Sequence, residues 1–328
     1  MSKEKAYLTI EQQIKHLKSK GLEIKHETLA KRYLGEIGYY KLINGYREPF
    51  IVKICEGQQE YTKFIEETSI DELYELYRFD HALQSLLLRY ITEIEINIKA
   101  RLSEVISSKY GIKETEYLCK KNFKKDDEVH IKFYQLKREI LKTLRNQQDK
   151  QASIVWYYKN YGFYPFWIIS NVLPLGTISL VYLKMKQPDQ YLISHYFGIK
   201  PKLMESSLSV LTLFRNACAH NERVYNFNTR HFIAHGDLKN IYEFLGIEKS
   251  LTTNRYIKGQ NDVLSVIIIF KLLLSKSQYS EFIDQYFSLI KKFKEKFREQ
   301  MYSNIMKSMG IVFEIKKLKE LQKIKSSN

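Results

Sequence analysis

The protein has few cysteines, little proline or glycine and no long hydrophobic run, and each shortage excludes a class of protein. Its three cysteines are far apart and include no CxxC pair, so we expect neither a disulfide framework nor a zinc site. The longest apolar run, residues 263–274, contains Ser265 and Lys271 and is too short to span a bilayer. The first residues are polar and contain no signal-peptide core. We therefore expect a cytoplasmic protein with no membrane partner, no metal ion and no other cofactor.

Only five prolines and thirteen glycines interrupt the 328 residues, and apolar side chains recur at three- and four-residue spacing. Strand patterns are weak, with at most a short pair around residues 223–234. The sequence therefore predicts an all-α fold. We divide it into an N-terminal helical and aromatic cap at residues 1–65, a helical bundle core at 66–245, and a C-terminal extension at 246–328 with a basic helix and tail.

Local signals place the bounds of several helices. A long helix is expected to begin near residues 69–71 and to stop at Gly111, and Pro201 suits the first turn of a helix over residues 201–219. The other helices are expected at about 10–20, 27–37, 127–146, 154–160, 167–173, 176–186, 237–245, 262–274 and 280–306, with one short turn at 194–197.

The charge balance indicates a polyanionic partner. The chain has 53 Lys and Arg against 37 Asp and Glu, a formal net charge of +16. Such an excess favours nucleic acid first and an anionic membrane surface second. A lysine-rich segment could follow an RNA backbone, although a solvated face is the usual role of such a segment. The candidate RNA contacts in it are Lys120, Lys121, Lys124 and Lys125.

The most informative motif is Arg215-Asn216-x-x-x-His220, near the end of the helix over residues 201–219. A histidine can move protons near neutral pH, and an arginine can hold a phosphate. On a helical wheel of about 100° per residue, Arg215 falls inside an apolar stripe, where an unpaired guanidinium is costly. One interpretation is an ion pair with Glu93 or Glu95. The other is that its partner is a scissile phosphate.

On a continuous helix, His220 lies about 140° around the wheel from Arg215. Two geometries would bring the side chains together. Either the helix ends near Ala219 and His220 turns back on a loop, or two copies of the motif face each other across a dimer axis. Asn216 shares a face with His220 and could orient its ring or bind phosphate. A histidine at this position could also be a simple C-cap.

Two residues just beyond the motif are further candidates for RNA contact. Arg223 could bind a phosphate, and Tyr225 could stack on an unpaired base. The other tyrosines are expected to lie mostly in the core, as aromatic clusters in helical proteins usually do. That expectation covers Tyr39, Tyr40, Tyr157, Tyr158 and Tyr161.

Four further stretches have a recognisable order and spacing: LTIEQQI at 8–14, IGYYKL at 37–42, LYRFD at 76–80, and PFW at 165–167 followed by LGTIS at 175–179. With them, residues 6–235 resemble the Abi-like proteins of bacterial abortive infection, the AbiD/AbiF group. The Arg215–His220 motif resembles the Arg-polar-x-x-x-His signature of HEPN domains, helical bundles that often act as metal-independent endoribonucleases. One departure is Asn171, where many relatives have a glutamate, which puts a role for an acid there in doubt.

The resemblance implies a HEPN-like bundle that cleaves RNA during phage defence in a toxin-like manner. His220 would be the general base or acid, Arg215 would stabilise the pentacoordinate phosphate, and Asn216 would position one or the other. The products would be a 2′,3′-cyclic phosphate and a 5′-hydroxyl. It also implies a homodimer and regulation by a structured noncoding RNA. The alternative is a nonenzymatic RNA-binding module, in which Arg215 and His220 are structural or grip phosphate.

Overall fold

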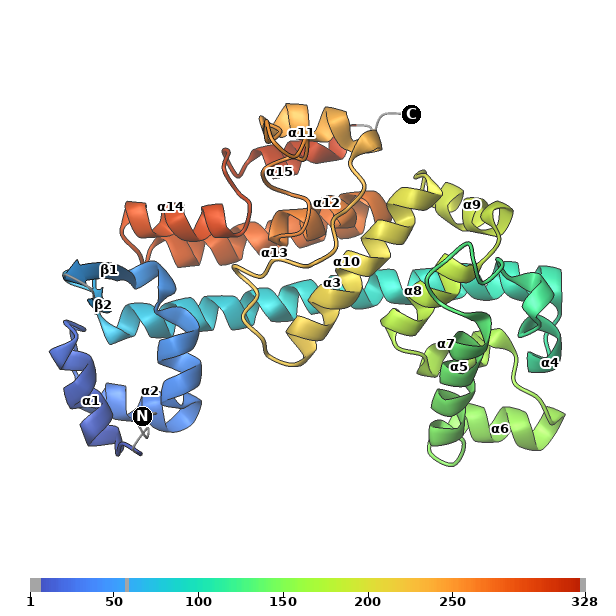
Figure 1. Cartoon of the computed structure of the whole chain (residues 1–328), viewed down its shortest axis with the longest axis horizontal. Helices are drawn as coiled ribbons and strands as arrows, with labels where there is room; N and C mark the ends of the chain where they lie inside the picture. Colours follow the sequence, from blue (N-terminus) through green and yellow to red (C-terminus); the bar gives the residue numbers. More distant parts are fainter. Residues whose placement is uncertain (1–6, 57–58, 325–328) are drawn as a thin grey trace.

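One long helix, α3, forms the axis of the molecule, as the computed structural model, which describes residues 7–56 and 59–324, shows in Figure 1. α3 spans Ile70–Tyr110, which is 41 residues, or about 60 Å at 1.5 Å per residue. Ser69 and Glu72 form a capping box at its start, and Gly111, with a φ of 90°, ends it. Both bounds are close to those predicted from the sequence.

The N-terminal segment covers one end of α3 (Figure 1). Two helices there match the predicted ranges, and a capping box formed by Thr9 and Gln12 begins the first. An antiparallel hairpin follows, with Ile51 opposite Phe64. The predicted strand pair around residues 223–234 is wrong, because that segment is a loop. The elements are α1 (Ile10–Ser19), α2 (Glu27–Ile37), a π-helical turn (Tyr40–Asn44), a 3-10 turn (Glu48–Phe50), β1 (Ile51–Glu56) and β2 (Gln59–Phe64).

Short helices surround the other end of α3 (Figure 1). The short α4 (Glu114–Tyr117) was not predicted, and two other helices differ from the prediction. α5 begins at Phe133, later than expected, and α9 is a helix of 10 residues where only a short turn was expected. Pro188 lies in the first turn of α9, where a missing N–H does no harm. The elements are α4 (Glu114–Tyr117), a 3-10 turn (Lys120–Asn122), α5 (Phe133–Gln147), α6 (Ala152–Tyr161), α7 (Phe166–Val172), α8 (Leu175–Lys184) and α9 (Gln187–Tyr196).

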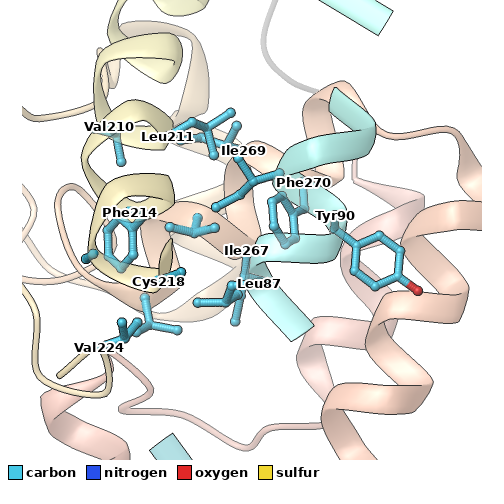
Figure 2. Packing of buried hydrophobic residues seen from close by; sticks show 14 of the residues in the cluster. Leu87, Tyr90, Val210, Leu211, Phe214, Cys218, Val224, Ile267, Ile269 and Phe270 are labelled. Carbon is cyan, nitrogen blue, oxygen red and sulfur yellow. The ribbon is translucent and has the colours of Figure 1, made fainter. Parts of the chain in front are cut away.

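Helix α10, Pro201–Ala219, crosses α3 and has the predicted bounds. It packs against α3, α8, α9 and the C-terminal helix α12, Val263–Leu273. Figure 2 shows the apolar stripe of α10, with Phe214 and Cys218 among buried residues that include Leu87 of α3 and Ile267 of α12. This packing holds the motif-bearing end of α10 against the centre of the molecule.

The C-terminal segment lies along α3 beside α10 (Figure 1). The single helix predicted over 280–306 is wrong: the chain breaks between Lys294 and Glu299. At the break, the ring of Phe297 packs 4.5 Å from that of Phe293 and 6.2 Å from that of Phe50. The elements are a 3-10 turn (Gly236–Leu238), α11 (Lys239–Leu245), α12, α13 (Lys276–Lys294), α14 (Glu299–Ser308), α15 (Lys317–Glu320) and a 3-10 turn (Leu321–Lys323).

The buried apolar residues of all three predicted parts belong to one hydrophobic cluster. The division of the chain into three parts at residues 65 and 245 therefore stays a prediction. The hydrophobic core of the described residues is continuous across both positions. Within the described ranges, no helix is long and apolar enough to cross a membrane.

An ion pair between the buried Lys184 and the partly exposed Asp126 fixes the lysine-rich loop between α4 and α5. The ammonium of Lys184, which is fully buried, lies 2.9 Å from the carboxylate of Asp126 and also donates to the carbonyl of Lys125. Asp126 accepts the N–H of Phe133 as well, which explains why α5 begins there. The hydrogen bond from Lys184, followed by those from Phe133 and Lys120, lowers the pKa of Asp126 below its ordinary range.

This pair predicts a specific loss of stability in acid. A carboxyl with a lowered pKa stabilises the fold above its unfolded pKa, and that contribution is lost as the pH falls through the folded value. At neutral pH we therefore expect Asp126→Asn to melt at a lower temperature than the wild type. The difference should shrink as the pH is lowered below about 4. Melting curves over this range check it, with Asp127→Asn, a change of an exposed neighbour, as control. A difference that does not depend on pH would contradict the assignment.

Candidate functional site

The C-terminal end of α10 fixes the position of His220. The N–H of Glu222 donates to the carbonyl of Ala217 at 2.9 Å, and the N–H of Asn221 donates to the carbonyl of Cys218 at 3.3 Å. Asn221 has a φ of 54°, as the left-handed residue of a Schellman motif requires. The chain thus reverses after His220, not before it.

The side chains of Asn216 and His220 therefore keep their helical relation. The N–H of His220 donates to the carbonyl of Asn216 at 3.0 Å, as in a continuing helix, and both residues are exposed. The loop geometry that would turn His220 back toward Arg215 is absent from this chain. By helical geometry the two side chains diverge by about 140° and lie about 7.5 Å apart along the axis.

Arg215 is half-buried at the edge of the apolar stripe, next to the buried Phe214. Among residues 7–56 and 59–324, its guanidinium has no hydrogen bond and no ion pair. The side chains of Asn216 and His220 likewise have no partner in the described chain. Three polar side chains at one helix end are thus available to an outside ligand.

The expected ion pair between Arg215 and Glu93 or Glu95 is wrong. Glu95 is nearly buried and pairs with Lys99 at 2.7 Å, one turn further along α3. Glu93 accepts a hydrogen bond from Gln278 at 2.7 Å and lies 3.6 Å from Arg89. Both carboxylates are already satisfied by partners on α3 and α13, which the spacing on α10 alone does not reveal.

A buried carboxylate on α3 holds the loop that follows the motif. Asp80 is fully buried and accepts the backbone N–H of Val224 at 3.1 Å and that of Tyr225 at 2.7 Å. It also accepts the hydroxyl of Tyr46 at 2.9 Å and the amide of Gln84 at 3.0 Å. Burial raises the pKa of Asp80, and these hydrogen bonds oppose that rise. The carboxylate joins three segments that are far apart in the sequence.

Further contacts strengthen the same anchor. The amide of Gln84 also donates to the carbonyl of Glu222 at 3.0 Å. Arg223 donates to the carbonyl of Gly45 and lies 3.4 Å from the carboxylate of Glu48. The guanidinium of Arg223, a candidate RNA contact, is therefore bound to the N-terminal segment in this structure.

The prediction that Tyr225 stacks on an RNA base is wrong for this structure, because Tyr225 is fully buried. Its ring lies 6.2 Å from that of Tyr46, with the guanidinium of Arg223 5.9 Å from its centroid. Asp80 draws the backbone of this residue inward, and burial raises the pKa of its hydroxyl.

Some tyrosines expected in the core are instead at the surface. Tyr40, Tyr158 and Tyr161 are exposed, as is Trp156. Tyr39 and Tyr157 are only partly buried. The expectation of core packing is thus wrong for three of the five tyrosines considered, and α6 carries an open aromatic surface.

The four candidate lysines lie on the loop between α4 and α5, near the starts of α9 and α10. Lys120 pairs with Asp126 at 3.1 Å. Lys124 donates to Gln190 at 2.9 Å, and burial lowers its pKa. The side chains of Lys121 and Lys125 are exposed, with no partner in the part of the chain that the structure describes. They are at the opposite end of α10 from the motif.

The thiol beside the motif, that of Cys218, is not available for chemistry. Burial raises the pKa of the Cys218 thiol to about 12, so this thiol remains protonated and packs as an apolar group. Within the described ranges, no group of three or more His, Cys, Asp or Glu side chains could hold a metal ion. At this helix end the motif offers an imidazole for proton transfer and a guanidinium for charge stabilisation.

Sequence reasoning missed Asp80 and Gln84 as the residues that position the motif. Both lie four residues apart on the buried face of α3, where a polar side chain needs a partner. A carboxylate inside an otherwise apolar helical stripe was the available signal. What it contacts depends on the fold, since Val224 is 144 positions away.

The chain matches the model of a known family. A model of the family described as Abi-like protein matches residues 32–226, more than half of the chain. The matched region includes α3, α10, Asp80 and the complete motif. No curated protein and no solved structure matches the chain.

The Asp80 anchor makes a prediction about stability. Asp80→Ala leaves the buried N–H groups of Val224 and Tyr225 without an acceptor, so we expect the free energy of unfolding to fall by about 3 kcal/mol or more. Asp80→Asn should also destabilise, because its amide nitrogen cannot accept. Urea denaturation measures the change, with Asp127→Ala, which removes an exposed carboxylate, as control. A loss below about 1 kcal/mol would show that the anchor is weak.

Proposed function

Because this chain belongs to the Abi-like protein family, we propose that it acts in abortive infection as a metal-independent endoribonuclease. In this proposal it is the toxin-like part of a bacterial anti-phage system, and RNA is its substrate. Family membership supports the abortive-infection role. The cleavage activity is inferred from the residues of the motif and their surroundings.

One observation carries the proposal. Arg215, Asn216 and His220 lie at one helix end, with side chains that have no partner in the described chain. A half-buried guanidinium without an anion is unfavourable, so its retention favours an external anion. A histidine and an arginine are the two groups that cleavage by the 2′-hydroxyl of RNA requires.

The chemistry needs no nucleophile from the protein. His220 removes the proton of the 2′-hydroxyl, whose oxygen attacks the adjacent phosphorus, while the bond from phosphorus to the 5′-oxygen breaks. The leaving oxygen takes up a proton from a second acid, and the products are a 2′,3′-cyclic phosphate and a 5′-hydroxyl. Arg215 stabilises the charge of the pentacoordinate phosphate, and Asn216 positions the imidazole or a phosphate oxygen.

The divergence of Arg215 and His220 on one helix favours a site made by two chains. In a homodimer with motif facing motif, the arginine of one protomer and the histidine of the other can reach the same phosphate. The two histidines can then serve as base and acid. We therefore propose a homodimer as the active form.

The same divergence favours the second candidate, a nonenzymatic RNA-binding module. In a monomer, Arg215 could grip a phosphate without His220 taking part, and His220 would then serve only as the C-cap of α10. The formal charge of +16 suits either reading. It also suits a structured noncoding RNA as a regulatory partner that holds the protein in check.

Cleavage of single-stranded RNA in EDTA distinguishes the two candidates. We expect the wild type to cut and to leave cyclic phosphate ends. His220→Ala should lower the rate by roughly 10²–10⁴-fold, as loss of a general base or acid does. Arg215→Ala should lower it by roughly 10²–10³-fold. Binding of the same RNA should be nearly unchanged in His220→Ala.

Two nearby exposed residues provide matched controls. Arg230→Ala and His231→Ala remove the same side-chain types from the loop after the motif, and both should cut like the wild type. Equal rates for His220→Ala and the wild type would leave the RNA-binding module as the function. Loss of wild-type cleavage in EDTA would refute the metal-independent mechanism.

A mixing experiment tests the site shared between protomers. Arg215→Ala and His220→Ala homodimers should both be inactive. A heterodimer of the two variants has one intact arginine and one intact histidine across the axis, so co-expression should restore part of the activity. If the site lay within one chain, no protomer in the mixture would be complete and activity would stay absent. Light scattering establishes the oligomeric state of each sample.

A further inference from the structure

A large basic cavity lies at the end of α10 that is remote from the motif. Its volume is about 1060 Å³, and it is bounded by the loop between α4 and α5 and by the starts of α9 and α10. Its lining includes two glutamates, Glu128 and Glu205. It also includes seven lysines: Lys120, Lys121, Lys124, Lys125, Lys186, Lys200 and Lys202. Three separate segments thus direct positive charge into one concave surface.

Much of this charge is not neutralised within the protein. Lys120 and Lys200 pair with Asp126 and Asp237 at 3.1 and 2.6 Å. The other exposed lysines of the lining have side chains with no hydrogen bond or ion pair to any described residue: Lys121, Lys125, Lys186 and Lys202. Like charges gathered without counterions are unfavourable, and an anionic ligand relieves their repulsion.

The loop that carries four of these lysines is held in place before any ligand arrives. The pair of Lys184 with Asp126 fixes its middle, and the backbone N–H of Lys124 donates to the carbonyl of Lys184 at 2.9 Å. The side chain of Lys124 is bound to Gln190. A fixed loop loses little freedom on binding, which favours a preformed site.

The backbone adds to the positive potential. α9 and α10 begin at this cavity, after Lys186 and Lys200, and neither helix start has a side-chain cap. The free N–H groups of a first helical turn attract anions, although Pro188 and Pro201 have none and those of Asp189 and Leu203 donate to the carbonyls of Lys186 and Lys200. They supplement the lysines, which are the main source of charge.

The composition of the lining indicates phosphates rather than a base. Lysines are point charges that contact backbone phosphates without reading sequence. The apolar part of the lining is Phe123, which is buried, and Pro201, so no exposed aromatic ring is present for stacking. A free nucleotide would need such base contacts, whereas an RNA strand needs only a row of phosphates.

We propose that this cavity is a docking site for the phosphates of an RNA strand, separate from the cleavage motif at the other end of α10. The inference rests on the proposed function only in taking RNA as the partner. The two ends of the 19-residue helix are about 27 Å apart. An RNA that contacts both sites is therefore held by its backbone at one end of α10 and cut at the other.

Binding of RNA by uncleaving protein tests the cavity alone. The background is full-length His220→Ala. The cavity triple adds Lys121→Glu, Lys186→Glu and Lys202→Glu to it. The affinity of both proteins for a labelled single-stranded RNA is measured by fluorescence anisotropy over a range of salt concentrations. We expect affinity to fall by at least about tenfold. The slope of log affinity against log salt should become shallower by about 2, since three phosphate contacts are lost at about 0.7 each.

A second triple variant separates the cavity from net charge. Lys291→Glu, Lys292→Glu and Lys296→Glu make the same charge change on exposed lysines near the end of α13. The proposal expects this control to keep most of the affinity and the slope. An equal loss of RNA affinity in both triple variants would overturn the docking site. So would an unchanged RNA affinity in the cavity triple, provided that its circular dichroism spectrum is that of the folded protein.

Two further measurements close the remaining alternatives. Inorganic triphosphate and ATP are tested as competitors of the labelled RNA. If they displace it as well as unlabelled RNA does at the same concentration, the cavity is a small-phosphate site and the proposal fails. In cleavage assays the cavity triple in an otherwise wild-type chain should raise KM and leave kcat unchanged. If His220→Ala cleaves like the wild type while the cavity triple still loses RNA, the nuclease mechanism fails and the docking site stands.

Discussion

The motif depends on one buried carboxylate. Asp80 accepts hydrogen bonds from the loop after α10, from Tyr46 in the N-terminal segment and from Gln84 on its own helix. Because each donor would be unsatisfied in the interior without it, the three segments are held together at one point. The end of α10 can therefore hold exposed polar side chains at fixed positions, on a helix whose opposite face packs against α3 and α12.

Local chemistry determined how much of the fold the sequence could predict. The bounds of α3 follow from Ser69, Glu72 and Gly111, and those of α10 from Pro201, because each acts on its own backbone. The break after α13 has no glycine or proline to announce it; there Phe297 packs against Phe293 and against Phe50, which is far away in the sequence. The hairpin β1–β2 and the length of α9 were missed although each has a local signal: the β-branched residues of β1 favour a strand, and Pro188 lies in the first turn of α9.

The same limit applies to the site. The wheel placed Arg215 inside an apolar stripe, whereas the structure has it half-buried at the edge, and the wheel could not show that Lys99 already satisfies Glu95. Tyr225 follows the motif in a polar segment, yet its backbone is drawn into the core by a residue of α3. The lysines at 120–125 stood out as a run. These lysines line one cavity with Lys186 and Lys202 because the starts of α9 and α10 lie close together. The spacing of residues along the sequence does not predict that proximity.

The geometry of α10 constrains what the motif can do. Since the Schellman turn begins only after His220, no rotation of the side chains on one rigid helix makes Arg215 and His220 parallel. A half-buried guanidinium without a carboxylate is partly desolvated, which favours an anion supplied from outside the chain. In the function proposed above, a phosphate would supply that charge, and a second α10 facing the first would supply the missing imidazole from the required direction. An RNA held between two protomers would meet both conditions, whereas a lone protomer would meet only the first.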